Sequence, residues 1–291
     1  MTSDDTLPPF GGAEAACPYD AAGVAILPVP FEATVSYGGG TAGGPAAILR
    51  ASTQVELYDE HLLREPFRAG LWTDAMLDVS GTTEQVVGRI EGRFGALMEA
   101  GKWVVMLGGE HSITPGGVAA AVRRYEDLQL VQLDAHADLR QEYAGDRWSH
   151  ACAMARCIDL RVPLTAIGIR NYCIDEARWI GQGIPGYRIF HAWEMEQDAW
   201  IDRALDGLQK QPVYLTIDLD YFDPAIIPAT GTPEPGGGAW WPTLRFLERL
   251  IKRTNVVACD LVELAPSPGL HHADFTAARL AYKLIGMRFP L

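Results

Sequence analysis

The stretch Leu128–Asp138 reads LQLVQLDAHAD and joins an apolar run to a cluster of side chains that can bind metal ions. A second stretch of the same kind, Val213–Asp220, reads VYLTIDLD. A short, nearly continuous apolar run is typical of a buried strand, and alternate side chains along a strand share a face. Each stretch therefore predicts a buried strand that carries acids and imidazoles at its end.

Strand-like and helix-like patterns alternate along the rest of the chain, which predicts an α/β fold with a mainly parallel sheet. The predicted strands are Gly23–Pro28, Ala69–Trp72, Trp103–Leu107, Leu128–Leu133, Leu164–Gly168, Tyr187–Phe190, Val213–Ile217 and Val256–Leu261. The predicted helices are Pro45–Leu57, Thr83–Ala100, Pro115–Tyr125, Ser149–Asp159, Cys173–Gly181, Glu194–Leu208, Pro242–Arg253 and Phe275–Ile285. The alternation does not distinguish an open sheet from a closed barrel, and both place functional groups at the carboxyl ends of strands.

No linker or repeat divides the chain, so we expect one catalytic domain over residues 19–291, preceded by a flexible tail over residues 1–18. The formal net charge of -13 excludes nucleic acid as an expected partner and suits a cationic small molecule. The sequence has no apolar run of transmembrane length and no basic, apolar leader. Its five cysteines form no CxxC pair, which favours reduced thiols and a cytoplasmic protein.

A third polar cluster, Gly108–Thr114 (GGEHSIT), follows another apolar strand and brings a histidine to the same end of the sheet. Together the clusters offer six candidate metal ligands: His111, Asp134, His136, Asp138, Asp218 and Asp220. Six ligands of mostly hard oxygen are too many for one tetrahedral zinc ion and suit two Mn²⁺-like ions. Each cluster alone could instead be turn or helix-cap chemistry, but a structural role does not explain why all three lie at strand ends.

The three motifs GGEHSIT (108–114), DAHADLR (134–140) and TIDLDYFDPAIIPATGTPEPGG (216–237) resemble the signatures of the ureohydrolase family, which includes arginase, agmatinase, guanidinobutyrase and formiminoglutamase. The resemblance covers residues 38–286. It implies a single-domain, three-layer α/β/α fold with an eight-stranded, mainly parallel sheet. It also implies a centre of two manganese ions, hydrolysis of a guanidino group to an amine and urea, and a homo-oligomer, trimeric or hexameric.

The resemblance assigns roles to the ligands by motif. His111 and Asp138 would complete one manganese site and His136 and Asp220 the other, while Asp134 and Asp218 would bridge the two ions. His150 matches the family's active-site histidine, which is thought to pass a proton to the leaving amine. Glu263 matches the glutamate that pairs with the guanidinium group. On residues alone, His150 could equally be a packing histidine and Glu263 a solvated acid at a strand end.

The loop Leu139–Ser149 is similar to the agmatinase branch of the family, and it lacks the Asn/Ser-rich segment of arginases. Agmatine and water would then give putrescine and urea, a step in polyamine biosynthesis. The acids and aromatic rings of the loop Leu139–Ser149 suit an aliphatic cation, so we predict that this loop contacts the substrate. The residues predicted to do so are Glu142, Tyr143, Asp146 and Trp148.

Several alternatives remain open at this point. The same core motifs fit a ureohydrolase acting on N1-aminopropylagmatine, which would give spermidine and urea, or a guanidinobutyrase. A zinc-dependent deacylase shares the general fold and an Asp-x-His feature, but it needs fewer ligands and one metal ion. A metal-bound scaffold without activity is a further alternative, and it would leave His150 and Glu263 unexplained.

Overall fold

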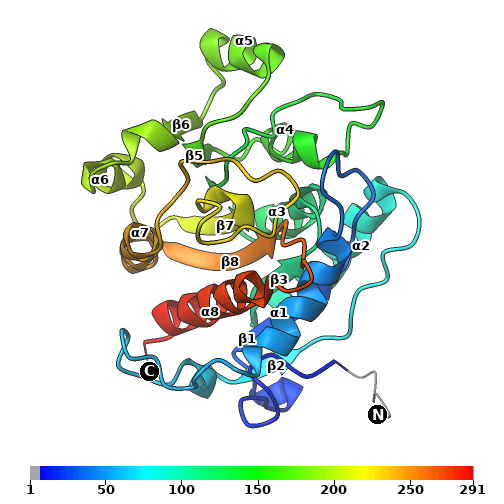
Figure 1. The fold of residues 1–291 in the computed structure, drawn as a ribbon, viewed down its shortest axis with the longest axis vertical. Helices are drawn as coiled ribbons and strands as arrows, with labels where there is room; N and C mark the ends of the chain where they lie inside the picture. The colour runs from blue at the N-terminus through cyan, green and yellow to red at the C-terminus, as the bar shows by residue number, and fades with distance from the viewer. Residues whose placement is uncertain (1–6, 291) are drawn as a thin grey trace.

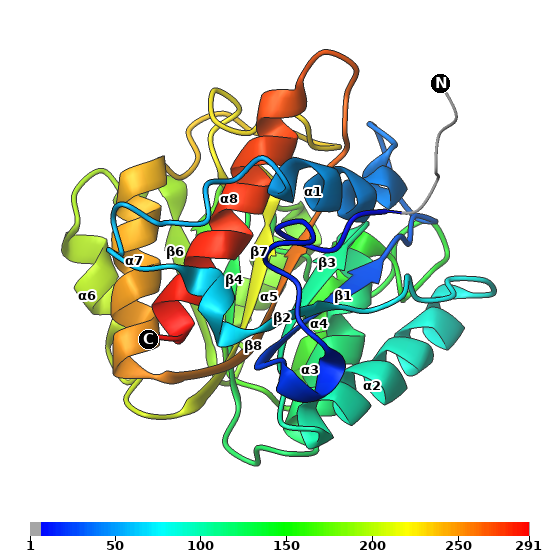
Figure 2. The ribbon, with the colours of Figure 1, turned by 90° about the horizontal axis from the view of Figure 1, so that it is seen from below.

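The computed structural model describes residues 7–290, which form one eight-stranded sheet between layers of helices (Figures 1 and 2). All strand pairs are parallel, and the order across the sheet is β2-β1-β3-β8-β7-β4-β5-β6. The strands are β1 (Val24–Val29), β2 (Leu71–Thr73), β3 (Trp103–Gly108), β4 (Gln129–Leu133), β5 (Leu164–Ile169), β6 (Tyr187–His191), β7 (Pro212–Asp218) and β8 (Asn255–Val262). The predicted fold class and all eight predicted strands are confirmed.

Two helical layers cover the sheet, and each buries an apolar cluster against one face. Helices α1, α6, α7 and α8 pack on one face, and α2, α3 and α4 on the other (Figure 2). The helices are α1 (Gly44–Ser52), α2 (Thr83–Glu99), α3 (Thr114–Val122), α4 (Ala153–Asp159), α5 (Ile174–Gln182), α6 (Ala199–Leu205), α7 (Trp240–Arg253) and α8 (His271–Arg288). None of the helices within residues 7–290 is long and apolar enough to span a membrane.

Some helix boundaries differ from the prediction. Helix α1 ends at Ser52 rather than Leu57, because the hydroxyls of Ser52 and Thr53 donate to the carbonyls of Leu49 and Arg50 and so compete with further helical bonds. Helix α8 begins four residues earlier than expected, at His271. Helix α6 is shorter than the predicted Glu194–Leu208, since a short 3₁₀ turn over Ala192–Glu194 precedes it.

The segment before residue 19 differs from the expected flexible tail over its described part, residues 7–18. Phe10 is buried, and its backbone N–H donates to the Thr73 hydroxyl. The Cys17 N–H donates to the carbonyl of Leu71, so this segment adds an isolated bridge at the edge of β2. Residues 1–6 lie outside the described part of the chain. Apolar burial and edge pairing thus fix a segment whose composition suggested a loose one.

The strand order places a topological switch point between β4 and β7. The chain leaves β7 toward β8 on one side, and it leaves β4 toward β5 on the other. In open parallel sheets, ligands bind in the crevice outside the carboxyl ends of the strands at such a point. The clusters that begin at Asp134 and Asp218 follow these two strands, so the topology brings them together at this crevice.

A buried ion pair ties the loop after α1 to the middle of α8. The Lys283 ammonium donates to both carboxylate oxygens of Asp59, at 3.0 and 2.8 Å, and both side chains are nearly inaccessible. Burial opposes ionisation of Asp59, but the Lys283 hydrogen bond and the N–H of Leu62 hold its pKa below the ordinary value. The negative charge of Asp59 therefore lies directly against the Lys283 ammonium, within the apolar packing of α8.

Candidate metal centre

Two groups of histidine and aspartate side chains meet at the carboxyl end of the sheet, and each could hold a metal ion. The first group is His111, Asp134 and Asp218, and the second is Asp134, His136 and Asp220. Asp134 belongs to both groups, as expected for a carboxylate that bridges two ions. Asp218 lies with the first group, and its Oδ1 accepts the backbone N–H of Asp220.

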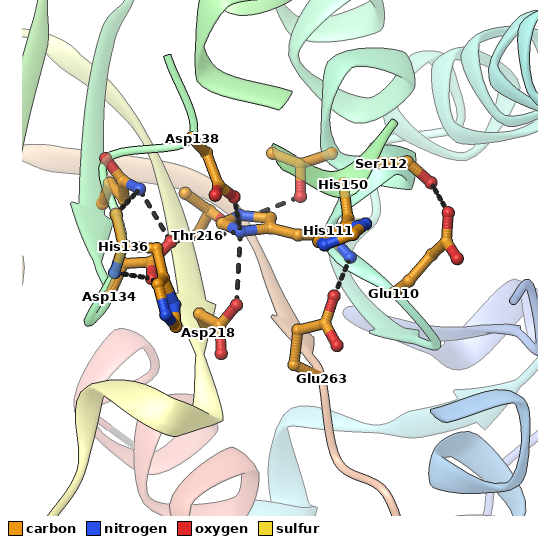
Figure 3. Close-up of polar contacts among 12 residues, drawn as sticks. Glu110, His111, Ser112, Asp134, His136, Asp138, His150, Thr216, Asp218 and Glu263 are labelled. Atoms are coloured by element: carbon orange, nitrogen blue, oxygen red, sulfur yellow. Dashed lines mark hydrogen bonds and ion pairs between the residues drawn. The ribbon is translucent and has the colours of Figure 1, made fainter. Parts of the chain in front are cut away.

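The ring of His111 lies between the carboxylates that surround the first group (Figure 3). Its Nδ1 is 3.2 Å from Asp134, 3.0 Å from Asp138 and 3.3 Å from Asp218. In the second group, Nδ1 of His136 is 2.9 Å from the carboxylate of Asp220. All six predicted ligands therefore lie together, although they come from three separate strand ends.

Hydrogen-bond direction indicates which nitrogen of His111 could bind a metal. The Thr216 hydroxyl donates its only hydrogen to Asp260, at 2.6 Å, so it accepts from Nε2 of His111, at 2.9 Å. That leaves the lone pair on Nδ1, which is buried and has no hydrogen-bond partner among the described residues. An unpaired imidazole nitrogen facing several carboxylates fits a divalent cation. The bonds from Nε2 to Thr216 and on to Asp260 resemble the outer hydrogen bonds that orient metal-binding histidines.

The buried carboxylates of the cluster repel one another, and bound cations would stabilise them. Burial, with repulsion from Asp138 and Asp220, raises the pKa of Asp134 to about 7. Burial and the charges of Asp220 and Asp134 also raise the pKa of Asp218 well above its ordinary range. Burial works against the charge of His136 as well, yet the Asp220 carboxylate raises its pKa to about 10. Two divalent cations would satisfy these carboxylates without bound protons.

Two residues of the site have a backbone conformation that non-glycine residues rarely adopt. The φ angles of Asp138 and Glu263 are +51° and +66°. Such left-handed conformations cost of order 1 kcal/mol or more and persist where the surrounding structure imposes them. Here they turn the Asp138 carboxylate toward His111 and place Glu263, just after β8, at the wall of the cavity.

A cavity of about 190 Å³ opens over the metal-ligand cluster, and both predicted catalytic residues line it. Glu263 is buried, and its Oε1 accepts the backbone N–H of His111 at 2.6 Å (Figure 3). Burial and the neighbouring charge of Glu110 raise the pKa of Glu263 well above its ordinary range. His150 begins a 3₁₀ turn before α4, and its ring lies edge-on to Tyr143. The structure thus places His150, Glu263 and the metal ligands around one cavity.

The structure separates the four residues predicted to contact substrate. Only Tyr143 lines the cavity. Glu142 is exposed, and Trp148 is half-buried outside the cavity lining. The Asp146 carboxylate accepts the Trp148 N–H at 2.7 Å, because Tyr143 and Asp146 close a tight backbone turn. The geometry therefore does not support substrate contact by Glu142, Asp146 or Trp148.

The site also contains residues that the sequence reasoning missed. Arg170 donates to the backbone carbonyls of Asp220 and Glu234, each at 2.8 Å, and so fixes the loop after β7. Glu176 is buried in the cavity wall, where it accepts the N–H groups of Leu139 and Cys173. Thr216 could have been found, since it lies two residues before Asp218 and thus on the same face of the strand.

An all-parallel eight-stranded sheet with paired His–carboxylate groups at its switch point defines a three-layer α/β protein suited to binding divalent metals. The family model described as the arginase family matches residues 22–286. The chain therefore belongs to the arginase family, as its motifs suggested.

Individual relatives give a finer comparison. The chain is 42% identical over 286 residues to the N(1)-aminopropylagmatine ureohydrolase of Synechocystis, with 95% of this chain and 92% of the relative covered. It is 34% identical over 273 residues to the agmatinase of Pyrococcus horikoshii, with 90% of each covered. The crystal structure of the agmatine ureohydrolase of Thermoplasma volcanium has a TM-score of 0.87 at 31% identity, covering 97% of this chain and 94% of that one.

Proposed function

We propose that this protein hydrolyses the guanidino group of an agmatine-type amine, releasing urea and the corresponding amine. The observation that carries the proposal is the single cavity shared by two His–carboxylate groups, Glu263 and His150. When bound, two divalent ions would supply Lewis-acid activation of the attacking water. Membership of the arginase family supports the same chemistry.

Glu263 and His150 have separate roles in this proposal. A planar guanidinium favours a carboxylate partner, and Glu263 presents a buried one at the cavity wall. Burial and the charge of Glu110 raise the pKa of Glu263, and the positive charge of a bound guanidinium would oppose both effects. His150 would carry a proton to the leaving amine nitrogen, a transfer that imidazole performs near neutral pH.

The ligand chemistry supports two manganese ions per chain. The set is four carboxylates and two imidazoles, and hard oxygen donors with imidazole suit Mn²⁺ better than a thiolate-selecting metal. A single zinc ion would leave several buried carboxylates without counter-charge. Metal analysis of protein refolded or grown with Mn²⁺ should give about two ions per chain. One tightly bound zinc ion would instead favour the deacylase alternative.

His150→Gln should lower kcat for urea release by about 10²–10³-fold and leave the metal content unchanged, because general acid–base catalysis contributes on this scale. Urea release and metal analysis on the same preparation measure both quantities. Glu263→Gln should mainly raise KM, since it removes the charge that pairs with the guanidinium. Full activity in His150→Gln would contradict the proton-transfer role.

Agmatine is the first proposed substrate, with putrescine and urea as products. The cavity wall beyond the metal ligands carries Tyr143, Tyr172 and Glu176, which suit an aliphatic amine tail. N1-aminopropylagmatine, giving spermidine and urea, is a second candidate, because the Synechocystis relative is more similar to this chain than the P. horikoshii agmatinase. Either reaction would place the protein in polyamine biosynthesis.

Steady-state kinetics on manganese-loaded protein distinguishes these substrates. The kcat/KM values for agmatine, N1-aminopropylagmatine, arginine and 4-guanidinobutyrate should rank one of the two agmatine-type cations first. We expect arginine to be poorer by about 10²-fold or more, since its extra carboxylate would enter a cavity lined by several carboxylates, where Arg140 is the one arginine among the described residues of the lining. A preference for arginine or 4-guanidinobutyrate would overturn the substrate assignment.

A further inference from the structure

A buried carboxylate lies behind the proposed proton-transfer residue and reaches it through one threonine hydroxyl. Glu110 is inaccessible to solvent, and its carboxylate accepts four hydrogen bonds. The backbone N–H groups of Ala33 and Thr34 donate to Oε2, each at 2.7 Å. The hydroxyls of Thr34 and Ser112 donate to Oε1, at 2.7 and 2.6 Å (the Ser112 contact is drawn in Figure 3). Glu110 therefore holds Thr34 by both its backbone and its side chain.

The Thr34 hydroxyl also contacts His150 twice. Its Oγ1 is 2.9 Å from the backbone nitrogen of His150 and 3.1 Å from ring nitrogen Nδ1. A hydroxyl has one hydrogen to donate and two lone pairs that accept. Because Thr34 gives its hydrogen to Glu110, both contacts to His150 must be bonds that the hydroxyl accepts. Nδ1 must then carry a proton, and a neutral ring has its lone pair on Nε2.

We propose that Glu110 and Thr34 are positioning residues that hold His150 in the tautomer protonated on Nδ1. This leaves Nε2 as the atom that takes up and releases the proton passed to the leaving amine, so the inference rests on the proposed function. The pattern matches Asp260–Thr216–His111 in the same site, where a carboxylate and a threonine select the nitrogen of a second histidine. Ser149, whose Oγ is 3.3 Å from Nδ1 of His150, adds a weaker contact that does not fix the tautomer.

Two substitutions change this arrangement in different ways: one removes the selection of a tautomer, and the other selects the opposite tautomer. Thr34→Val keeps the shape and removes the hydroxyl, so the tautomer is no longer selected. Glu110→Gln keeps the shape and reverses the direction of the bonds. The two backbone N–H groups require an oxygen where Oε2 lies, so the amide nitrogen would face Thr34 and donate to it. The Thr34 hydroxyl would then donate to Nδ1, which requires the proton on Nε2.

The test reads the tautomer directly and independently of turnover. Protein with ¹⁵N-labelled histidine and loaded with Mg²⁺, which has no unpaired electrons, is studied by long-range ¹H–¹⁵N correlation NMR. The signals of His150 are those absent in His150→Gln. We expect the proton on Nδ1 in the natural sequence and in Thr34→Ser, a mixture in Thr34→Val, and the proton on Nε2 in Glu110→Gln. A proton on Nε2 in the natural sequence would overturn the proposal.

Steady-state kinetics on the manganese-loaded protein tests the positioning role separately. Thr34→Val should lower kcat by about tenfold to hundredfold with little change in KM, and Thr34→Ser should restore most of it. Thr254→Val is the matched control, because its hydroxyl donates to the Leu250 carbonyl at the opposite end of the sheet. Unchanged kcat in Thr34→Val would contradict the positioning role. If the protein releases no urea from any guanidino substrate, the proposed function fails while the NMR arm still decides the tautomer.

Discussion

Asp218→Asn should reduce urea release by about 10³-fold or more and lower the bound metal below two ions per chain. Asp218 lies against His111 at 3.3 Å, and its other oxygen accepts the N–H of Asp220. An amide keeps that second contact but cannot supply an anionic ligand. Loss of a ligand from a two-metal site removes the activation that a bound cation gives to water.

Metal content by elemental analysis and the thermal midpoint with and without Mn²⁺ check this expectation. Added Mn²⁺ should raise the midpoint of the natural sequence, because a ligand that binds the folded state stabilises it. Asp218→Asn should show a smaller increase. Asp127→Asn is the matched control, since Asp127 is exposed at the other end of β4. Two tightly bound ions and full activity in Asp218→Asn would refute the assignment of Asp218 as a ligand.

Lys283→Met should lower the free energy of unfolding by about 3 kcal/mol, because it leaves the buried carboxylate of Asp59 without its ammonium partner. The remaining cation, Arg279, is 3.9 Å from Asp59. Urea unfolding measured by circular dichroism gives the difference. Lys252→Met is the control: Lys252 pairs with Glu248 on the exposed side of α7, so its loss should cost less than about 0.5 kcal/mol. If both substitutions lowered the free energy of unfolding equally, burial would not be the reason that the Lys283–Asp59 pair stabilises the fold.

The Lys283 effect should also depend on pH. The pKa of Asp59 is lowered in the folded protein, so its contribution to stability is present above the unfolded value of about 3.9 and is lost as the pH falls through the folded pKa. The stability difference between the natural sequence and Lys283→Met should therefore be largest near neutral pH and shrink below about pH 4. A difference that is constant from pH 7 to pH 3 would show that packing, rather than charge, causes the loss.

The sequence was sufficient to predict the sheet and the grouping of the six candidate metal ligands at one end of it, because both depend on local patterns. An apolar run followed by acids marks a strand end, and parallel strands bring such ends to one edge. The contact between Thr34 and His150 joins residues 116 positions apart and has no sequence pattern. The substrate contacts predicted for Asp146 and Trp148 stay predictions, and both side chains lie outside the cavity lining. The reason is again structural: residues 143–146 form a tight turn, and the Asp146 carboxylate accepts the backbone N–H of Trp148.

The switch point between β4 and β7 divides the site into parts that can change independently in evolution. The candidate metal ligands Asp134 and Asp218 stand at the ends of β4 and β7, where sheet pairing fixes the backbone, and the other four lie in the turns that follow the strands. The cavity wall that would face the far end of a substrate comes instead from loop residues such as Tyr37, Tyr143 and Tyr172. Insertions and replacements in loops are tolerated far better than changes in paired strands. A lineage can thus alter which amine it accepts while its metal chemistry stays intact, which suits a family whose members carry different substrate names.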